Sequence, residues 1–423
     1  MRNTTVKKSV VILKSSVKFM REFLRWAVFA LAVGCIGGVI GAMFHKAVSG
    51  ANDFRSAHTW LVYLLPVGGL VIVGMYKLLS MFDNKGTDDI IDAVREDEGV
   101  PFRTAPLIFI STFITHLLGG SAGREGAALQ LGGSIGYQSG KIFRLDEKDK
   151  HIAVMCGMSA LFSALFGTPI TSTIFAMEVV SVGVMYYSGL IPCLFSALTS
   201  YAITLLFGIS PTRFIIGNVP SLEVLPLLLT VALAALCAGL SVVFCIMLHG
   251  SADIMKRIFK NPYIRIAVGG LIVIALTLLC GCSDYNGAGS QIINNAVNGT
   301  VKPEAFALKI LFTAVTIGAG FKGGEIVPTF FVGSTFGCLI GGLIGLDPGF
   351  GASVGMVAMF CGMLNCPVAS VILSVELFGT QGMIFYGAAA AVSYMLSGYY
   401  GLYHSQKIMY SKFRAEYINK NTK

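Results

Sequence analysis

The chain has 423 residues, of which 55% are hydrophobic, 13% are charged and 50 are glycine, and its mean hydropathy is +0.75. Ordinary soluble domains carry about 25% charged residues, so this composition excludes a soluble enzyme and a disordered chain. An outer-membrane barrel is excluded too, because its strands alternate apolar and polar residues. We therefore predict an all-α polytopic membrane protein that is not an enzyme.

The net charge of +9 is concentrated at the two ends of the chain. Arginine and lysine are frequent in residues 1–23 and again after residue 403. Short basic segments beside membrane spans lie in the cytoplasm. We therefore expect 1–23 and 404–423 to be cytoplasmic segments of a multi-pass plasma-membrane protein, with the lipid bilayer and not nucleic acid as its surroundings.

Apolar blocks fill most of the remaining sequence. A bilayer core about 30 Å thick needs about 20 apolar residues per spanning helix. Uninterrupted blocks near this length are found at about 24–49, 58–82, 104–119, 186–208, 222–250, 264–283, 304–320 and 379–403. Blocks broken by glycine or proline are found at 119–142, 151–183, 318–346 and 349–378. Broken helices at membrane depth are tolerated where they line a polar cavity or are covered by protein, so we expect the chemistry there.

The sequence also contains a weak internal repeat. Residues 168–179 read TPITSTIFAMEV and residues 366–377 read CPVASVILSVEL, with proline and glutamate each recurring after 198 residues. Upstream of each lies a glycine-rich segment with a glutamate, and these two glutamates, Glu125 and Glu325, are 200 residues apart. Matching broken helices in two halves indicate a transport site.

The repeat predicts two related transmembrane halves, which we place at 24–215 and 216–403. The spacing alone leaves open whether the halves are parallel or inverted.

The segment Gly123-Arg124-Glu125-Gly126 opens an apolar run. The free backbone N–H groups and positive dipole end of a helix start attract anions. A carboxylate at this place can occupy the anion site itself and leave when it is protonated, so Glu125 is a candidate gate and proton carrier. The alternative is that Glu125 caps its helix beside Arg124.

A second helix start is predicted at Gly324-Glu325-Ile326-Val327-Pro328, where Pro328 suits a first helical turn. We expect the amides of Ile326 and Val327 to point at the same anion and Glu325 to lie near its path. The alternative is a Lys322–Glu325 pair on a surface loop.

Other polar residues have weaker signals. Glu178 and Glu376 each end an apolar run, and we favour hydrogen bonds to the backbone that brace the broken helices over a proton relay. Thr87 starts a further helix and could donate to an anion or simply cap it. Tyr403 lies where the last apolar block ends, either as a neutral donor to an anion or as an interface anchor. No metal-ligating spacing or cofactor motif is present.

Taken together in order from Gly86 to Tyr403, these segments resemble the CLC family of chloride channels and anion/proton antiporters. The resemblance implies an inverted-repeat homodimer with one pore per subunit. It implies that Glu125 matches the external gating glutamate and that Tyr403 matches the central tyrosine. It matches Ile326, with Glu325 before it, to the second anion-binding helix start, and Thr87, loosely, to the central serine.

Three departures from the common family pattern favour its fluoride/proton branch. Ala127 replaces a proline after the GREG sequence, an acid lies inside the GGEIVP motif, and Val179 stands where many exchangers have an internal proton-transfer glutamate. Against this, the NKGTDD loop around Thr87 fits neither branch cleanly.

We therefore expect exchange of a halide against protons, with fluoride ahead of chloride. The first alternative is a passive, voltage-gated-type chloride channel with the same site. A cation-coupled transporter of organic solutes is a further alternative, which the scarcity of acids in the apolar core argues against. A membrane scaffold without transport would not need glycine-broken helices.

Overall fold

The structure, a computed structural model, describes residues 2–82, 84–96 and 98–423, with side chains from residue 16 onward. Most of the predicted N-terminal basic cluster therefore lies outside the described side chains. The helices are α1 Arg2–Ala57, α2 Leu65–Leu78, α3 Thr87–Arg95, α4 Thr104–Leu117, α5 Glu125–Ile142, α6 Glu147–Phe166, α7 Pro169–Glu178, α8 Leu190–Leu206, α9 Val224–Ile258, α10 Pro262–Cys280, α11 Ser290–Val297, α12 Ala305–Ala319, α13 Ile326–Ile344, α14 Pro348–Leu364, α15 Pro367–Phe378 and α16 Met383–Leu396. A 3-10 helix, Thr59–Leu64, precedes α2, and a second one, Tyr187–Gly189, precedes α8.

Within the described residues, six helical segments are long and apolar enough to cross a membrane, among them α9, α10 and α13. Several shorter apolar helices lie between them. A chain with this many apolar spans is a multi-pass membrane protein. The predicted all-α polytopic fold is confirmed.

The breaks lie where the sequence predicts them. Gly167 and Thr168 separate α6 from α7, and Asn365 and Cys366 separate α14 from α15. Gly167 has a φ of +70° and Asn365 a φ of 56°, a left-handed conformation that glycine and asparagine tolerate best. Pro169 then begins α7, where its missing N–H costs no helical hydrogen bond.

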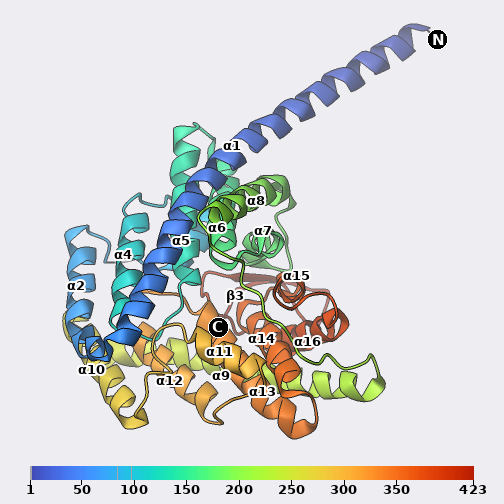
Figure 1. The fold of residues 1–423 in the computed structure, drawn as a ribbon. Helices are drawn as coiled ribbons and strands as arrows, with labels where there is room; N and C mark the ends of the chain where they lie inside the picture. Colours follow the sequence, from blue (N-terminus) through green and yellow to red (C-terminus); the bar gives the residue numbers. More distant parts are fainter. Residues whose placement is uncertain (1, 83, 97) are drawn as a thin grey trace.

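The two halves repeat the same series of helices. Helices α4, α5 and α6 recur as α12, α13 and α14, each beginning 201 residues later. Figure 1 shows the first half, coloured blue to green, mostly in the upper part of the view and the second half, yellow to red, in the lower part. The weak sequence repeat therefore corresponds to a structural repeat.

Glycine allows very close packing within each half. A Cβ added to Gly136 on α5 would lie 2.1 Å from the carbonyl oxygen of Ala153 on α6. A Cβ added to Gly337 on α13 would lie 2.2 Å from the carbonyl oxygen of Gly351 on α14. Small residues let membrane helices approach to backbone contact, so α5 and α13 are each held rigidly against the next helix.

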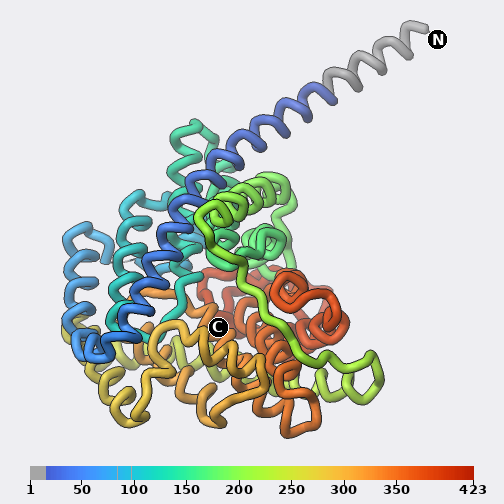
Figure 2. Tube along the Cα trace, in the orientation of Figure 1, coloured from blue at the N-terminus to red at the C-terminus, as the bar shows by residue number. Residues whose placement is uncertain are grey.

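Residues 207–223, here called the connector, join α8 to α9. Figure 2 shows the connector running across the front of the view from the first half to the second. Thr212 N donates to the carbonyl of Phe166 at the end of α6, and Phe214 N donates to the carbonyl of Leu377 in α15, both at 2.9 Å. The connector therefore ties both halves together, and the predicted boundary at residue 215 falls inside it.

The predicted tail, 404–423, is folded onto the helices. Strands β1 Ser181–Val182, β2 Lys407–Tyr410 and β3 Tyr417–Asn421 form a three-stranded sheet. β2 pairs in parallel with β1 and antiparallel with β3. Between β2 and β3, Lys412 Nζ donates to Asn365 Oδ1 at 2.5 Å and to the carbonyl of Tyr394 at 2.9 Å. The sequence analysis did not anticipate this small sheet.

Candidate anion site between the two halves

The loops that precede α5 and α13 are bonded to each other through their backbones. Gly123 N donates to the carbonyl of Gly324 at 2.6 Å, and Gly324 N donates to the carbonyl of Gly123 at 2.7 Å. A Cβ added to Gly324 would lie 2.4 Å from Gly126 N, so the close approach requires glycine. We call this contact the glycine seam; it brings the starts of two helices from different halves side by side.

Glu125 is the first residue of α5, and it is 2% exposed. One carboxylate oxygen accepts a hydrogen bond of 2.9 Å from Arg124 N, and the other lies 3.4 Å from Arg124 Nε. Arg124 also donates to Ser49 Oγ at 3.1 Å. The structure thus contains the Arg124 contact that the capping alternative required, and it places this contact at the glycine seam.

Glu325 directly precedes α13. One of its carboxylate oxygens lies 3.2 Å from the point that a Cβ on Gly126 would occupy, so this side chain approaches the start of α5. Lys322 is half-buried, with Nζ lying 4.5 Å from the ring centroid of Tyr76. The Lys322–Glu325 segment therefore lines a cavity between helices and is not an exposed surface loop.

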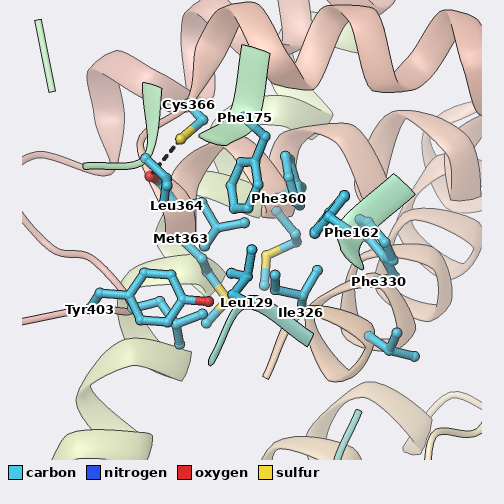
Figure 3. Packing of buried hydrophobic residues seen from close by; sticks show 14 of the residues in the cluster. Leu129, Phe162, Phe175, Ile326, Phe330, Phe360, Met363, Leu364, Cys366 and Tyr403 are labelled. Atoms are coloured by element: carbon cyan, nitrogen blue, oxygen red, sulfur yellow. Dashed lines mark hydrogen bonds between the residues drawn. The ribbon is translucent and has the colours of Figure 1, made fainter. Parts of the chain in front are cut away.

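Tyr403 is 4% exposed, and its phenol oxygen has no hydrogen-bond partner among the described residues. Figure 3 shows the phenol pointing toward Leu129 of α5 and Ile326 at the start of α13. A buried polar group without a partner is rare and costs free energy. The phenol is therefore available to a ligand, and its burial argues against the interface-anchor alternative.

Thr87 begins α3 and is buried. Its hydroxyl donates to the carbonyl of Gly126 at 3.3 Å and accepts from Gln130 Nε2 at 3.3 Å. In this arrangement the hydroxyl hydrogen of Thr87 is donated to Gly126 and is not available to an anion. Gln130 Oε1 has no partner among the described residues. Sequence analysis missed Gln130, although a lone amide in an apolar helix was an available signal.

Two cavities approach the glycine seam. The tail-side cavity, about 490 Å³ in volume, has Thr87, Gln130, Glu325 and Tyr403 in its lining. The connector-side cavity, about 620 Å³, is lined by Arg124, Glu125 and Val327 and by connector residues. Their described linings share no residue. Each cavity therefore contains one of the two seam glutamates.

Helix α10 shows that the cavities open on opposite sides. Pro262 and Arg265, at the start of α10, line the tail-side cavity, whereas Ser283, just beyond its end, lines the connector-side cavity. This helix has 19 residues, which at 1.5 Å per residue gives a length of about 28 Å. The parts of the two cavities at the opposite ends of α10 are thus separated by about the thickness of a bilayer core, while both cavities approach the glycine seam between them.

His116 supports the seam from within the first half, and sequence analysis assigned it no role. It is fully buried, with Nε2 lying 3.1 Å from the carbonyl of Gly123 and Nδ1 3.4 Å from the side chain of Asn52. From the second half, Thr316 Oγ1 accepts from Ser121 N at 3.1 Å. Side chains of both halves therefore fix the loop before α5.

Residues 68–398 match the family model described as voltage-gated chloride channel. The chain belongs to this family, the CLC family. It is 33% identical over 400 residues to a chloride/fluoride channel protein of Pseudomonas syringae pv. tomato, covering 92% of this chain and 87% of the relative. It is 24% identical to an H(+)/Cl(-) exchange transporter, ClcA, of Vibrio campbellii, covering 84% and 82% of the two chains.

Solved structures agree with this assignment. The crystal structure of a CLC-type fluoride/proton antiporter superimposes with a TM-score of 0.88 at 30% identity, covering 91% of this chain and 98% of that chain. A slow cyanobacterial Cl-/H+ antiporter, at 21% identity, has the same fold with a TM-score of 0.76, over 88% of this chain and 94% of that one. The fold is thus the CLC inverted repeat that the sequence analysis expected.

Proposed function

We propose that this protein exchanges a halide, fluoride ahead of chloride, against protons across the plasma membrane. The observation that carries the proposal is the pair of glutamates at the glycine seam, with Glu125 lining one cavity and Glu325 lining the other. Relatives named as a chloride/fluoride channel protein and as a fluoride/proton antiporter support the choice of ions.

The anion is attracted by the starts of α5 and α13. Backbone N–H groups near Gly126, Ile326 and Val327, together with the positive dipole ends of both helices, favour negative charge. The free phenol of Tyr403 supplies a neutral donor, and Thr87 becomes a second donor only if its hydroxyl turns away from Gly126. Hydrogen-bond donors of this kind can bind either halide, and the relatives named for fluoride are what place fluoride ahead of chloride in the proposal.

Glu125 acts as the gate. Its carboxylate, held by Arg124, occupies the start of α5 as a tethered anion. Protonation removes the charge that holds it, and the side chain leaves the site to the halide. Arg124 is then free to attract the next anion. Glu325 exchanges protons on the other side of the seam, because it faces the tail-side cavity.

We place the tail-side cavity in the cytoplasm. Lys256 and Arg257 lie in the last turn of α9, and Lys260 lies between α9 and α10 on that side. Basic residues beside membrane spans remain cytoplasmic. α1 ends beside the connector-side cavity. Because α1 spans the membrane, its start then lies on the cytoplasmic side. This supports a cytoplasmic position for both ends of the chain.

We also propose a homodimer, as the family resemblance implies. Apolar side chains are exposed at the starts of α7 and α15, with Ile170 51% and Val368 46% exposed. The two helices lie side by side and antiparallel, because a glutamate at or near the end of each binds the start of the other. A shared apolar face of this kind suits a second copy of the chain; the mass of the purified protein in detergent tests it.

Purified protein in liposomes tests the exchange. Opposed fluoride and pH gradients are imposed, and the reversal potential is measured. An antiporter has a reversal potential that shifts with the pH gradient, whereas the alternative, a passive channel, follows the fluoride gradient alone. The same preparation with chloride replacing fluoride measures the preference between the halides.

A further inference from the structure

Two histidines are stacked in the lining of the tail-side cavity. The rings of His249, on α9, and His404, directly after Tyr403, have centroids 3.9 Å apart and an interplanar angle of 32°. His249 Nε2 lies 3.2 Å from the carbonyl of Leu402. His404 is exposed and His249 is half-buried, so the pair reaches from solvent into the cavity. The exchange mechanism above uses neither residue.

The hydrogen bond fixes where the mobile proton binds. A carbonyl oxygen only accepts, so Nε2 of His249 carries a hydrogen and Nδ1 is the atom that gains or loses one. Two charged imidazole rings at this separation repel each other. The stacked pair therefore holds one extra proton more readily than two, and it returns to neutral when that proton leaves.

The remaining charged groups of the tail-side cavity are less suited to this exchange. Lys85, Lys256, Arg265 and Lys322 supply cations, and Asp88 and Asp253 supply carboxylates. The carboxylate of Asp88 already accepts a hydrogen bond from Ser405 N at 2.8 Å. Histidine is the side chain whose ordinary charge change falls between pH 5 and 8. The two histidines are the imidazoles of the described lining, and each ring has a nitrogen that can accept a proton and give it up again.

We propose that the His249–His404 pair relays protons between the tail-side solution and Glu325. In the inward step, an imidazolium N–H of the pair gives up its proton and a carboxylate oxygen of Glu325 receives it. The pair becomes neutral and the carboxylate becomes a carboxylic acid. The outward step is the reverse. Water in a cavity of about 490 Å³ bridges the groups. This proposal rests on the proposed halide/proton exchange.

The test compares H404N, H249N and the double variant with the unmodified protein in oriented liposomes. Fluoride-driven proton movement is measured with a pH-sensitive dye while the tail-side pH is varied from 5 to 8. We expect proton flux to fall at least tenfold in the double variant. We also expect the plot of proton flux against tail-side pH to lose its inflection in this variant. Proton flux is also expected to fall in H404A, in which the whole ring is removed, and imidazole added on the tail side is expected to restore it. H58N is the matched control, because His58 lies outside both cavity linings.

Each result decides the proposal. Unchanged proton flux in the double variant overturns the relay while the exchange function stands. Two further results also overturn the relay: a loss of proton flux that imidazole does not restore, and a loss that is accompanied by a lowered melting temperature. Either result assigns the histidine pair a structural role. Absence of coupling in the unmodified protein overturns the exchange function and the relay together.

Discussion

The carboxylate of Glu178, at the end of α7, binds the start of α15, and the carboxylate of Glu376, near the end of α15, binds the start of α7. Glu178 accepts from the first backbone N–H groups of α15 at 3.1 and 2.8 Å. Glu376 accepts from the first N–H groups of α7 at the same two distances. Each broken helix is therefore braced by the other half, as the sequence interpretation of these glutamates favoured.

Replacing either brace should destabilise the protein without changing its coupling. In E178Q and E376Q a neutral amide replaces the carboxylate, and its NH2 group cannot accept a hydrogen bond from the backbone N–H groups. We expect each substitution to lower the free energy of unfolding by about 1–3 kcal/mol. We expect lower melting temperatures in detergent and an unchanged ratio of protons to halide. E98Q, at an exposed position, is the control. A changed ratio in E376Q with normal stability would contradict the bracing role.

Removing the charge of Glu125 should abolish proton coupling. E125Q mimics the protonated side chain, so the gate no longer competes with the halide and no longer carries a proton. We expect fluoride movement to continue in liposomes while the dye reports no coupled proton movement. E147Q, which alters an exposed glutamate at the start of α6, should remain coupled. Proton movement that survives in E125Q would show that another residue is the gate.

Removing the phenol hydroxyl of Tyr403 should weaken halide binding but not stability. The hydroxyl has no partner among the described residues, whereas a hydrogen bond to a charged acceptor such as a halide is worth about 1.5–3 kcal/mol. Y403F should therefore bind fluoride about ten- to a hundredfold more weakly by titration calorimetry.

Y386F is the control for Y403F, because it should change stability and not fluoride binding. Tyr386 is also buried, but its hydroxyl lies 2.9 Å from Ser353 Oγ. We expect Y386F to lower the melting temperature and leave fluoride affinity unchanged. Equal affinities in Y403F and the unmodified protein would remove Tyr403 from the anion site.

Adding a methyl group at the glycine seam should separate the two helix starts. The new Cβ of G324A would lie 2.4 Å from Gly126 N, and overpacking of this kind costs about 1–3 kcal/mol. We expect a lower melting temperature and loss of fluoride flux. G239A on α9 is the control, because no described atom lies within 4 Å of its added Cβ. Normal flux in G324A would show that the seam does not position the site.

Much of the fold could be predicted because the bilayer imposes a simple rule on the sequence. Spanning helices need long apolar runs, and the breaks near Gly167 and Asn365 interrupt such runs visibly. The repeat was also detectable, because proline and glutamate at fixed places in 168–179 and 366–377 perform the same bracing task in both halves.

The partners of the site residues could not be predicted from spacing. His116 contacts Gly123 only because a turn brings the chain back after α4, and a histidine in an apolar block has no periodic signal. The contact between Lys412 and Asn365 depends on the tail folding back over 47 residues of chain. Contacts of this range depend on tertiary packing, which one sequence without homologues does not reveal.

The contact between Gly123 and Gly324 is made by peptide groups alone. Every residue type except proline offers the same peptide N–H and carbonyl, so this join carries no side-chain information of its own. The side chains around the join can therefore differ between the two halves as long as the backbones still approach this closely. The halves present different chemical groups to the two cavities and still meet at one shared point.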